Sequence, residues 1–268
     1  MDAPKSWDEI RAWRKRERAR LIALRVALGA DEHRLASQRI TAALVQGFAP
    51  LAAGVIGFCW PFQREFDPRF AVRRFRERGA KAVLPAVVDP KGPLQFREWW
   101  PGAPMAPGVY DIPVPQGTAV LKPDAAIVPM NGFDSAGFRL GYGGGYFDRT
   151  LAALAPRPLA IGVSFEALRL ASIFPQPHDI AMDFVVTEAA TYRVCKDSLL
   201  PIGAEQCMRE VTALCTQRGL SCTRLDDTDD AVAREYSSPA CYAHEFPGYF
   251  GEDAAADPQP APTPPKSS

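Results

Sequence analysis

Short apolar segments alternate with helical segments along the first 190 residues, and this alternation limits the possible folds more than any other feature. Runs short enough for buried strands lie at 54–60, 81–87 and 125–129. Segments with helical periodicity, such as 66–78, lie between or beside them. Strands that alternate with helices form βαβ units, whose strands are parallel. The pattern therefore predicts an α/β protein with a largely parallel sheet.

The bounds of the elements follow from periodicity and from the residues at their ends. Gly29 fits the C-terminal end of the first helix and Gly79 that of the third, whereas Asp31 can cap the second. Seven prolines between residues 92 and 123 predict loops around one strand at 95–99. Helices are predicted over 7–28, 31–46, 66–78 and 146–154, and further strands over 159–164 and 184–187.

The formal net charge of the 268 residues is zero, but this value combines two unequal parts. From residue 226 to the end, nine side chains are acidic and two are basic, whereas the first 225 residues hold 22 acidic and 29 basic side chains. The first part therefore has a charge of +7, which is compatible with an anionic ligand. A hydrophobic content of 47% excludes a wholly disordered chain, a collagen and a small disulfide scaffold.

Signals for secretion or membrane insertion are weak. The longest apolar stretch, 51–60, is ten residues long and too short to span a bilayer. The N-terminus lacks the apolar core of a signal peptide. The six cysteines form no CxxC pair, and Cys241 with His244 gives too few ligands for a zinc site. We therefore expect free thiols, a cytoplasmic location and no membrane association.

Periodicity weakens after residue 190, although 205–218 predicts a helix. We expect one domain over 7–190, a helical C-terminal extension of unknown role over 191–235, and an acidic, proline-rich, largely disordered tail over 236–268. In the tail, the aromatic segment 237–251 is either a docking motif or a cover for an apolar patch, and both alternatives stay open.

The segment 129–150, PMNGFDSAGFRLGYGGGYFDRT, carries the clearest chemical signal. It is rich in glycine, follows a buried strand and opens a helix, and free N–H groups at a helix N-terminus bind phosphate. It has neither the GxxxxGK[ST] nor the GxGxxG pattern, so a tight turn explains it equally well. Arg139, a fixed positive charge, and Asp148, a carboxylate suited to magnesium, favour a phosphate site.

This segment and its neighbours resemble the 5-formyltetrahydrofolate cyclo-ligases, or methenyltetrahydrofolate synthetases. That family has a strand ending in proline, then FD, a glycine and RLGxGxGYYD. Here Val128-Pro129, Phe133-Asp134, Gly137 and RLGYGGGYFDR (139–149) stand in that order, followed by IGVSF, Pro177-His178-Asp179 and FVVTE. The resemblance covers about 8–188. It implies a single-domain, three-layer α/β sandwich of the NagB/RpiA/CoA transferase-like type with a mainly parallel central sheet, in which 7–190 is catalytic.

The resemblance also implies an activity that depends on ATP and magnesium. Members convert 5-formyltetrahydrofolate to 5,10-methenyltetrahydrofolate and release ADP and phosphate; the formyl oxygen is thought to be phosphorylated before the ring closes. Matched positions make Arg139 and Tyr146 catalytic and make Asp148 and Asp179 magnesium ligands. The residues implied to bind ATP are Arg14, Arg18, Arg139, Gly141, Tyr142, Gly143, Gly144, Gly145 and Tyr146.

A second set of matched positions is implied to bind the folate. Glu65 stands where the family has an acid, which accepts hydrogen bonds from N–H groups of the pterin ring. Two positions depart from the pattern: Arg14 replaces a lysine, so that either Arg14 or Lys15 makes its ATP contact, and Phe147 replaces a tyrosine. The residues implied to bind the folate are Trp60, Glu65, Tyr110, Tyr142 and Tyr146.

Ordinary structural roles compete with several of these assignments. Asp148 also suits the dipole of its helix, Asp179 suits a turn, and Arg14 and Arg18 suit a solvated basic face. The leading hypothesis is a cyclo-ligase with 5-formyltetrahydrofolate and MgATP as partners and no nucleic acid. The alternatives are a non-catalytic folate- or nucleotide-binding relative that works through its C-terminal extension, and, by fold analogy alone, a sugar-phosphate isomerase or CoA-transferase-like enzyme. The oligomeric state stays open.

Overall fold

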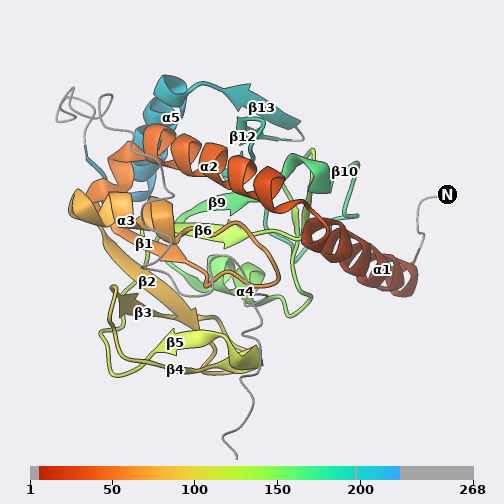
Figure 1. Cartoon of the computed structure of the whole chain (residues 1–268), viewed down its shortest axis with the longest axis horizontal. Coiled ribbons are helices and arrows are strands. Elements are labelled where there is room, and N and C mark those ends of the chain that lie inside the picture. Colours follow the sequence, from red (N-terminus) through yellow and green to blue (C-terminus); the bar gives the residue numbers. More distant parts are fainter. Residues whose placement is uncertain (1–5, 197, 224–268) are drawn as a thin grey trace, which may run out of the picture. The chain divides into compact units, whose positions relative to one another are not determined.

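An eight-stranded sheet forms the centre of the computed structural model, which describes residues 6–196 and 198–223. Its strand order is β13-β12-β11-β9-β6-β1-β2-β3, and the five strands from β11 to β2 are parallel (Figure 1). Antiparallel strands form both edges. The strands are β1 (Val55–Phe58), β2 (Lys81–Ala86), β3 (Gln95–Trp99), β6 (Ala125–Pro129), β9 (Leu159–Val163), β11 (Phe184–Val186), β12 (Thr191–Cys195) and β13 (Ser198–Ile202).

Helices cover both faces of this sheet. On one face, α2 packs against α3 and α5, and the ring of Phe48, just after α2, meets that of Phe184 on β11 at 5.2 Å. Side chains alternate across a strand, so the neighbouring Val185 belongs to the opposite face. The helices are α1 (Trp7–Val26), α2 (Ala30–Gly47), α3 (Arg69–Glu77), α4 (Tyr146–Ala153) and α5 (Ala204–Arg218).

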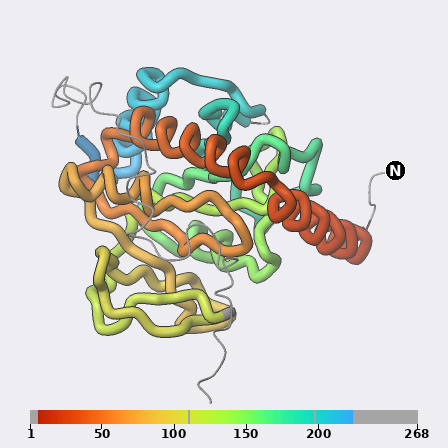
Figure 2. The backbone as a smooth tube through the Cα atoms, in the orientation of Figure 1, coloured from red at the N-terminus to blue at the C-terminus, as the bar shows by residue number. Residues whose placement is uncertain are grey.

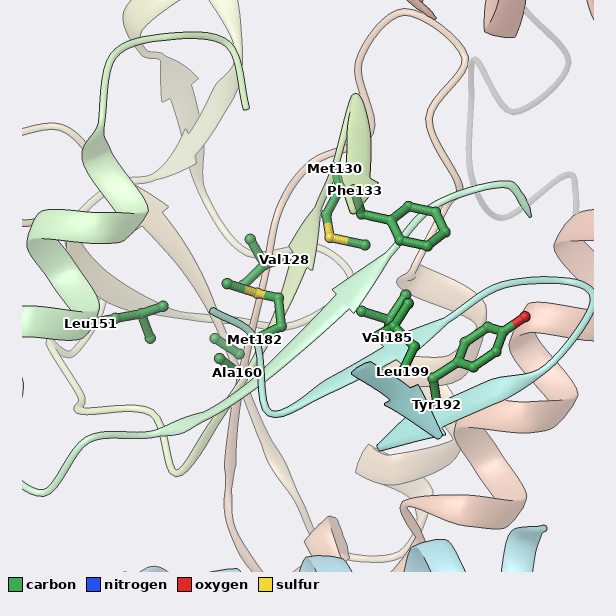
Figure 3. Packing of buried hydrophobic residues seen from close by; sticks show 10 residues of the cluster. Val128, Met130, Phe133, Leu151, Ala160, Met182, Val185, Tyr192 and Leu199 are labelled. Atoms are coloured by element: carbon green, nitrogen blue, oxygen red, sulfur yellow. The ribbon is translucent and has the colours of Figure 1, made fainter. Parts of the chain in front are cut away.

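The opposite face holds the apolar cluster drawn in Figure 3. Ala126 and Val128 of β6 and Ala160 of β9 pack there with Leu151, which α4 supplies. Because α2 and α4 thus lie on opposite faces, the molecule has three layers. The predicted α/β class with a mainly parallel central sheet is confirmed.

The order of the strands reverses direction between β1 and β6. The chain runs from β1 through α3 to β2 on one side, and from β6 through α4 to β9 on the other. In open parallel sheets, ligands bind in the crevice outside the carboxyl ends of the strands at such a point. The glycine-rich segment leaves the carboxyl end of β6 there, so the topology and the motif indicate the same place.

Two predicted helix ends are wrong. Gly29 does not close α1, which ends at Val26 with Ala27 as its C-cap; Gly29 is the N-cap of α2, with φ −58°. Asp31 does not cap α2 but lies in its first turn and pairs with Arg34 at 3.1 Å. The α2 cap makes no side-chain hydrogen bond. A three-residue connection, 27–29, between the helices therefore replaces the expected glycine stop.

Five short strands outside the central sheet were not predicted. The pairs β4–β5 and β7–β8 are antiparallel, and β10 joins β7 in parallel. Strands of two or three residues carry too little periodicity to be recognised. Their bounds are β4 (Met105–Pro107), β5 (Pro113–Pro115), β7 (Gly132–Asp134), β8 (Arg139–Leu140) and β10 (Arg169–Leu170).

The region after residue 190 continues the same sheet. Strands β12 and β13, which were not predicted, extend it beyond β11, and α5 matches the helix expected at 205–218. The tail over 236–268 lies outside the described residues, as does the pair Cys241 and His244. Within the described part, Cys59, Cys195, Cys207, Cys215 and Cys222 are free thiols, and no helix is long and apolar enough to cross a membrane.

Candidate active site

A cavity of about 1300 Å³ opens at the carboxyl ends of β1, β2 and β6. Its walls are α1, the glycine-rich loop 141–145, the segment after β1 and the loop at 178–179. Helix α1, which is far away in the sequence, contacts the segment just before the loop at 178–179. The tube in Figure 2 shows this helix running out beside the segment around β10. Every predicted site residue except Tyr110 lines this one cavity. Tyr110 belongs to a short 3-10 helix, η2 (Val109–Asp111), and its side chain is not described.

The glycine-rich loop lets arginines approach its backbone closely. Gly143 and Gly145 adopt φ values of 96° and 64°, which side-chain-bearing residues avoid. A Cβ atom at Gly143 would lie 3.1 Å from the Arg18 guanidinium, and one at Gly141 would clash with that of Arg139. Gly145 is also the N-cap of α4, so the first N–H groups of that helix follow the loop directly. The loop therefore presents backbone donors between two cations.

Two arginines of α1 lie where the glycine-rich loop forms the wall of the cavity. The Arg18 Nε donates to the carbonyl oxygen of Gly141 at 2.6 Å, and burial, then the nearby charge of Arg14, lowers the pKa of Arg18. Arg14 donates to both carboxylate oxygens of Asp179, at 3.2 and 2.5 Å. Lys15 also lines the cavity. The alternative in which Arg14 and Arg18 belong to a solvated basic face is wrong, because both side chains are partly buried by contacts with distant segments.

The two predicted metal ligands belong to neighbouring segments of the cavity wall. Asp148 Oδ1 accepts from the N–H of Ile180, the residue after Asp179, at 3.1 Å, and its other oxygen accepts from Arg139 at 3.0 Å. Both carboxylates are mostly buried, with 17% and 10% of the side chains exposed. Among the described residues no group of three His, Cys, Asp or Glu side chains could hold a metal. Two hard oxygen donors beside arginines and a glycine-rich loop nevertheless fit magnesium, which takes its other ligands from phosphate and water.

Arg139 has unused hydrogen-bonding capacity. Its guanidinium lies over the ring of Phe147 at 5.2 Å, and its buried Nε has no partner within the part of the chain that the structure describes. A buried donor without an acceptor is costly. An anionic ligand in the cavity would supply the acceptor.

A second part of the cavity wall is built around Glu65. Its side chain is buried, with 6% exposed; Oε1 accepts from the Tyr142 hydroxyl at 2.8 Å and Oε2 from the N–H of Phe62 at 3.1 Å. Burial raises the pKa of Glu65, whereas the charge of Arg25 and the two hydrogen bonds oppose that rise. Burial and the Glu65 charge raise the pKa of Tyr142, so its hydroxyl stays a donor.

Aromatic side chains line the cavity beside Glu65. Trp60 contacts the Trp99 ring at 6.3 Å and has the Arg69 guanidinium 4.5 Å above its ring. The Phe62 and Tyr142 rings lie 5.9 Å apart. These surfaces suit a flat heteroaromatic ring, and Glu65 supplies hydrogen-bond acceptors at its edge.

Some residues of this region were not predicted from the sequence. Cys59 and Phe62 line the cavity, and Arg25 lies behind Glu65. Burial, followed by the Glu65 charge, raises the pKa of the Cys59 thiol, so it stays neutral. A signal for Arg25 was present: it shares the helical face of Leu21 and Leu28, at i+4 and i+7, where a charge is unusual.

Comparison with known proteins agrees with this geometry. The profile of the 5-formyltetrahydrofolate cyclo-ligase family matches residues 10–188. A 5-formyltetrahydrofolate cyclo-ligase of Mycolicibacterium smegmatis is 36% identical over 119 residues, which are 41% of this chain and 61% of the relative. One from Mycoplasma pneumoniae is 28% identical over 78 residues, 28% of this chain and 47% of its own length. The matched stretches thus span about half to three fifths of these relatives.

Solved structures show the same fold. A 5,10-methenyltetrahydrofolate synthetase from Mycoplasma pneumoniae superimposes with a TM-score of 0.55 at 22% identity, covering 65% of this chain and 98% of its own. The synthetase of Aquifex aeolicus gives a TM-score of 0.60 at 23% identity, covering 68% and 92%. The profile covers well over half of the sequence and includes all residues that line the cavity except Trp7 and Asp8. The chain belongs to the 5-formyltetrahydrofolate cyclo-ligase family.

Proposed function

We propose that the protein converts 5-formyltetrahydrofolate to 5,10-methenyltetrahydrofolate at the expense of ATP, with magnesium, and releases ADP and phosphate. The observation that carries this proposal is a single cavity with two chemically different ends. One end gathers Arg14, Arg18 and Arg139 around a glycine loop, and the other places Glu65 among aromatic rings. A triphosphate suits the first end and a pterin suits the second.

The cationic end serves transfer of the terminal phosphoryl group to the formyl oxygen. Phosphoryl transfer needs neutralised charge and correct positioning more than a proton shuttle. Arg139 stabilises the charge on the transferred group, since its Nε is free to donate. Arg18 and the N–H groups that begin α4 hold the phosphates, and Tyr146, the first residue of that helix, separates the two ligands. The neighbouring folate nitrogen then closes the ring as phosphate leaves.

Asp148 and Asp179 would hold magnesium. When bound, the ion neutralises phosphate charge and orients the phosphoryl group. Each carboxylate has an arginine partner in the structure, so ATP would bring acceptors for Arg139 and Arg14 and leave the carboxylates free to coordinate.

The folate end orients the reacting formyl group by fixing the ring that carries it. Glu65 accepts from pterin N–H groups, and the Tyr142 ring covers the face of the pterin beside Trp60. Holding both substrates in one enclosed site replaces a collision in solution by a positioned reaction.

The direct experiment incubates the purified full-length chain with 5-formyltetrahydrofolate, ATP and magnesium and follows the absorbance of the methenyl product. We expect product formation that requires all three. Absence of product while an active family member works in parallel would refute the proposal. Tight folate binding without turnover would instead support the non-catalytic alternative. We place the reaction in the cytoplasm, where the five described thiols stay reduced.

A further inference from the structure

Arg25 is a buried cation outside the cavity wall. It lies in the last turn of α1, only 1% of its surface is exposed, and it is not among the described residues that line the cavity. An arginine is seldom fully buried unless its donors and its charge are used. The groups that satisfy it therefore indicate what it does.

The Arg25 guanidinium joins three segments that are far apart in the sequence. Nε donates to the Gln63 carbonyl oxygen at 3.0 Å, Nη1 to Asn131 Oδ1 at 2.8 Å, and Nη2 to the Tyr142 hydroxyl oxygen at 3.1 Å. Gln63 and Tyr142 both line the cavity. One side chain thus ties the loop after β1 and the glycine-rich loop to the end of α1.

The contact with Tyr142 continues to Glu65. The Tyr142 hydroxyl accepts from Arg25 and donates to Glu65 Oε1 at 2.8 Å. Within the described part of the chain, Arg25 is the cation whose charge acts on the Glu65 carboxyl; the Tyr142 hydroxyl, the Phe62 N–H and the Cys59 thiol also face this side chain, and the His33 ring lies against the Glu65 backbone. Without Arg25, burial would favour the protonated carboxyl, a weaker acceptor.

The loop that carries Glu65 needs external support. Gln63 and Arg64 have φ values of 47° and 57°, a left-handed conformation that costs energy for residues other than glycine. The Arg25 contact holds the Gln63 carbonyl, while His33 meets the Arg64 carbonyl oxygen at 3.0 Å and Arg64 donates to Leu28 at 2.9 Å. The first of these contacts comes from the same guanidinium that reaches Tyr142.

We infer that Arg25 is a positioning residue for the folate, which favours the ionised form of Glu65 and holds Tyr142 in place without touching the substrate. This inference rests on the proposed function. It assigns to the end of α1 a role at the folate end of the cavity, whereas Arg14 and Arg18, earlier on the same helix, serve the nucleotide end. The helix would thereby connect the two binding sites.

The test measures binding of 5-formyltetrahydrofolate and, separately, of MgATP to the full-length protein by calorimetry between pH 6 and 9. Arg25→Gln should weaken folate binding about ten- to a hundredfold at pH 7. Folate binding to this variant should strengthen as the pH rises, because more of Glu65 ionises, whereas wild-type binding should change little. MgATP binding should stay within about threefold of wild type.

Two further variants show whether Arg25 acts through Glu65. Arg25→Lys keeps a cation, so it should keep the flat pH profile while losing part of the affinity, since one ammonium cannot reach three acceptors in the arginine's geometry. In the double variant Arg25→Gln with Glu65→Gln, loss of affinity should be close to that of Glu65→Gln alone. If Arg25→Gln does not fold, the lysine variant carries the same test.

Arg218→Gln is the matched control. Arg218 is also a partly buried arginine, donating to both Asp183 oxygens at 2.9 and 2.6 Å, but it lies on α5 outside the cavity wall. The inference would be overturned if Arg25→Gln bound folate as tightly as the wild type does, or if its binding of folate and of MgATP were weakened by the same factor. A wild-type protein that binds no folate would instead refute the proposed function, which separates the two failures.

Discussion

The two ends of the cavity hold their carboxylates in different ways. At the proposed nucleotide end, Asp148 and Asp179 each pair directly with an arginine. At the proposed folate end, Glu65 is more deeply buried and is held by a tyrosine hydroxyl and a backbone N–H, with its cation one residue removed. Direct ion pairs can exchange partners when a ligand brings its own charge. A hydrogen-bonded anion behind a tyrosine is preorganised for a ligand that brings only N–H groups.

This difference indicates how each end achieves selectivity. In our proposal the nucleotide end recognises charge, so its affinity should depend on salt and on the metal. The folate end would recognise the pattern of donors on a ring, because a buried acceptor left without a donor is penalised. Variants that disturb one end should therefore leave the other largely unchanged, unless the altered residue lies between them.

The largest effect is expected from Arg139→Ala, which removes the cation nearest the transferred group. We predict a fall in kcat of about a thousandfold with folate affinity retained. Steady-state absorbance assays and calorimetry on one preparation measure both quantities. Arg157→Ala is the control, since Arg157 pairs with Asp183 away from the cavity. A kcat near that of wild type would show that Arg139 does not contact the reacting phosphoryl group.

Glu65→Gln should damage the other end alone. In this variant an NH₂ group replaces one acceptor oxygen and faces an N–H donor of the pterin. KM for folate should therefore rise about ten- to a hundredfold while KM for ATP stays constant. Initial rates at saturating levels of the second substrate separate the two constants. An equal rise of both would contradict the division of the cavity into two ends.

Gly144→Ala addresses the boundary between the ends. A Cβ atom there would lie 2.8 Å from the ring of Tyr146, which must then move. Because we propose that Tyr146 lies between the ligands, we predict that both KM values rise about tenfold, which corresponds to about 1.4 kcal/mol. Gly203→Ala, whose Cβ meets nothing within 4 Å, should leave kinetics unchanged. If only one KM changed, we would conclude that Tyr146 contacts only the ligand to which that KM refers.

The smallest effect is expected from Arg14→Lys, which restores the residue typical of the family. Lysine keeps the charge but gives up the two-pronged contact with Asp179, so KM for ATP should rise about threefold and become more sensitive to salt. Lys15→Ala, measured beside it, should have less effect. A larger effect for Lys15→Ala would show that Lys15, and not Arg14, makes the contact with ATP.

Sequence reasoning reached the central strands and most of the site for definite physical reasons. Strands such as β6 and β9 are buried on both faces and read as continuous apolar runs. The glycine-rich segment needs its residues for backbone geometry, which leaves a recognisable pattern. Strands β12 and β13 lie at an edge with mixed burial, and their pairing is decided by the rest of the sheet. Arg25 was missed because its partners are 38, 106 and 117 residues away.

The contact between Arg14 and Asp179 has a consequence for synthesis of the chain. The two residues are 165 positions apart, so the helix made first meets its partner only after nearly the whole described part has left the ribosome. At about 5–20 residues per second, that delay is on the order of ten seconds or more. Leu21 and Arg25 are the residues of α1 that become buried in the folded protein, so few of its side chains enter the core when the helix docks.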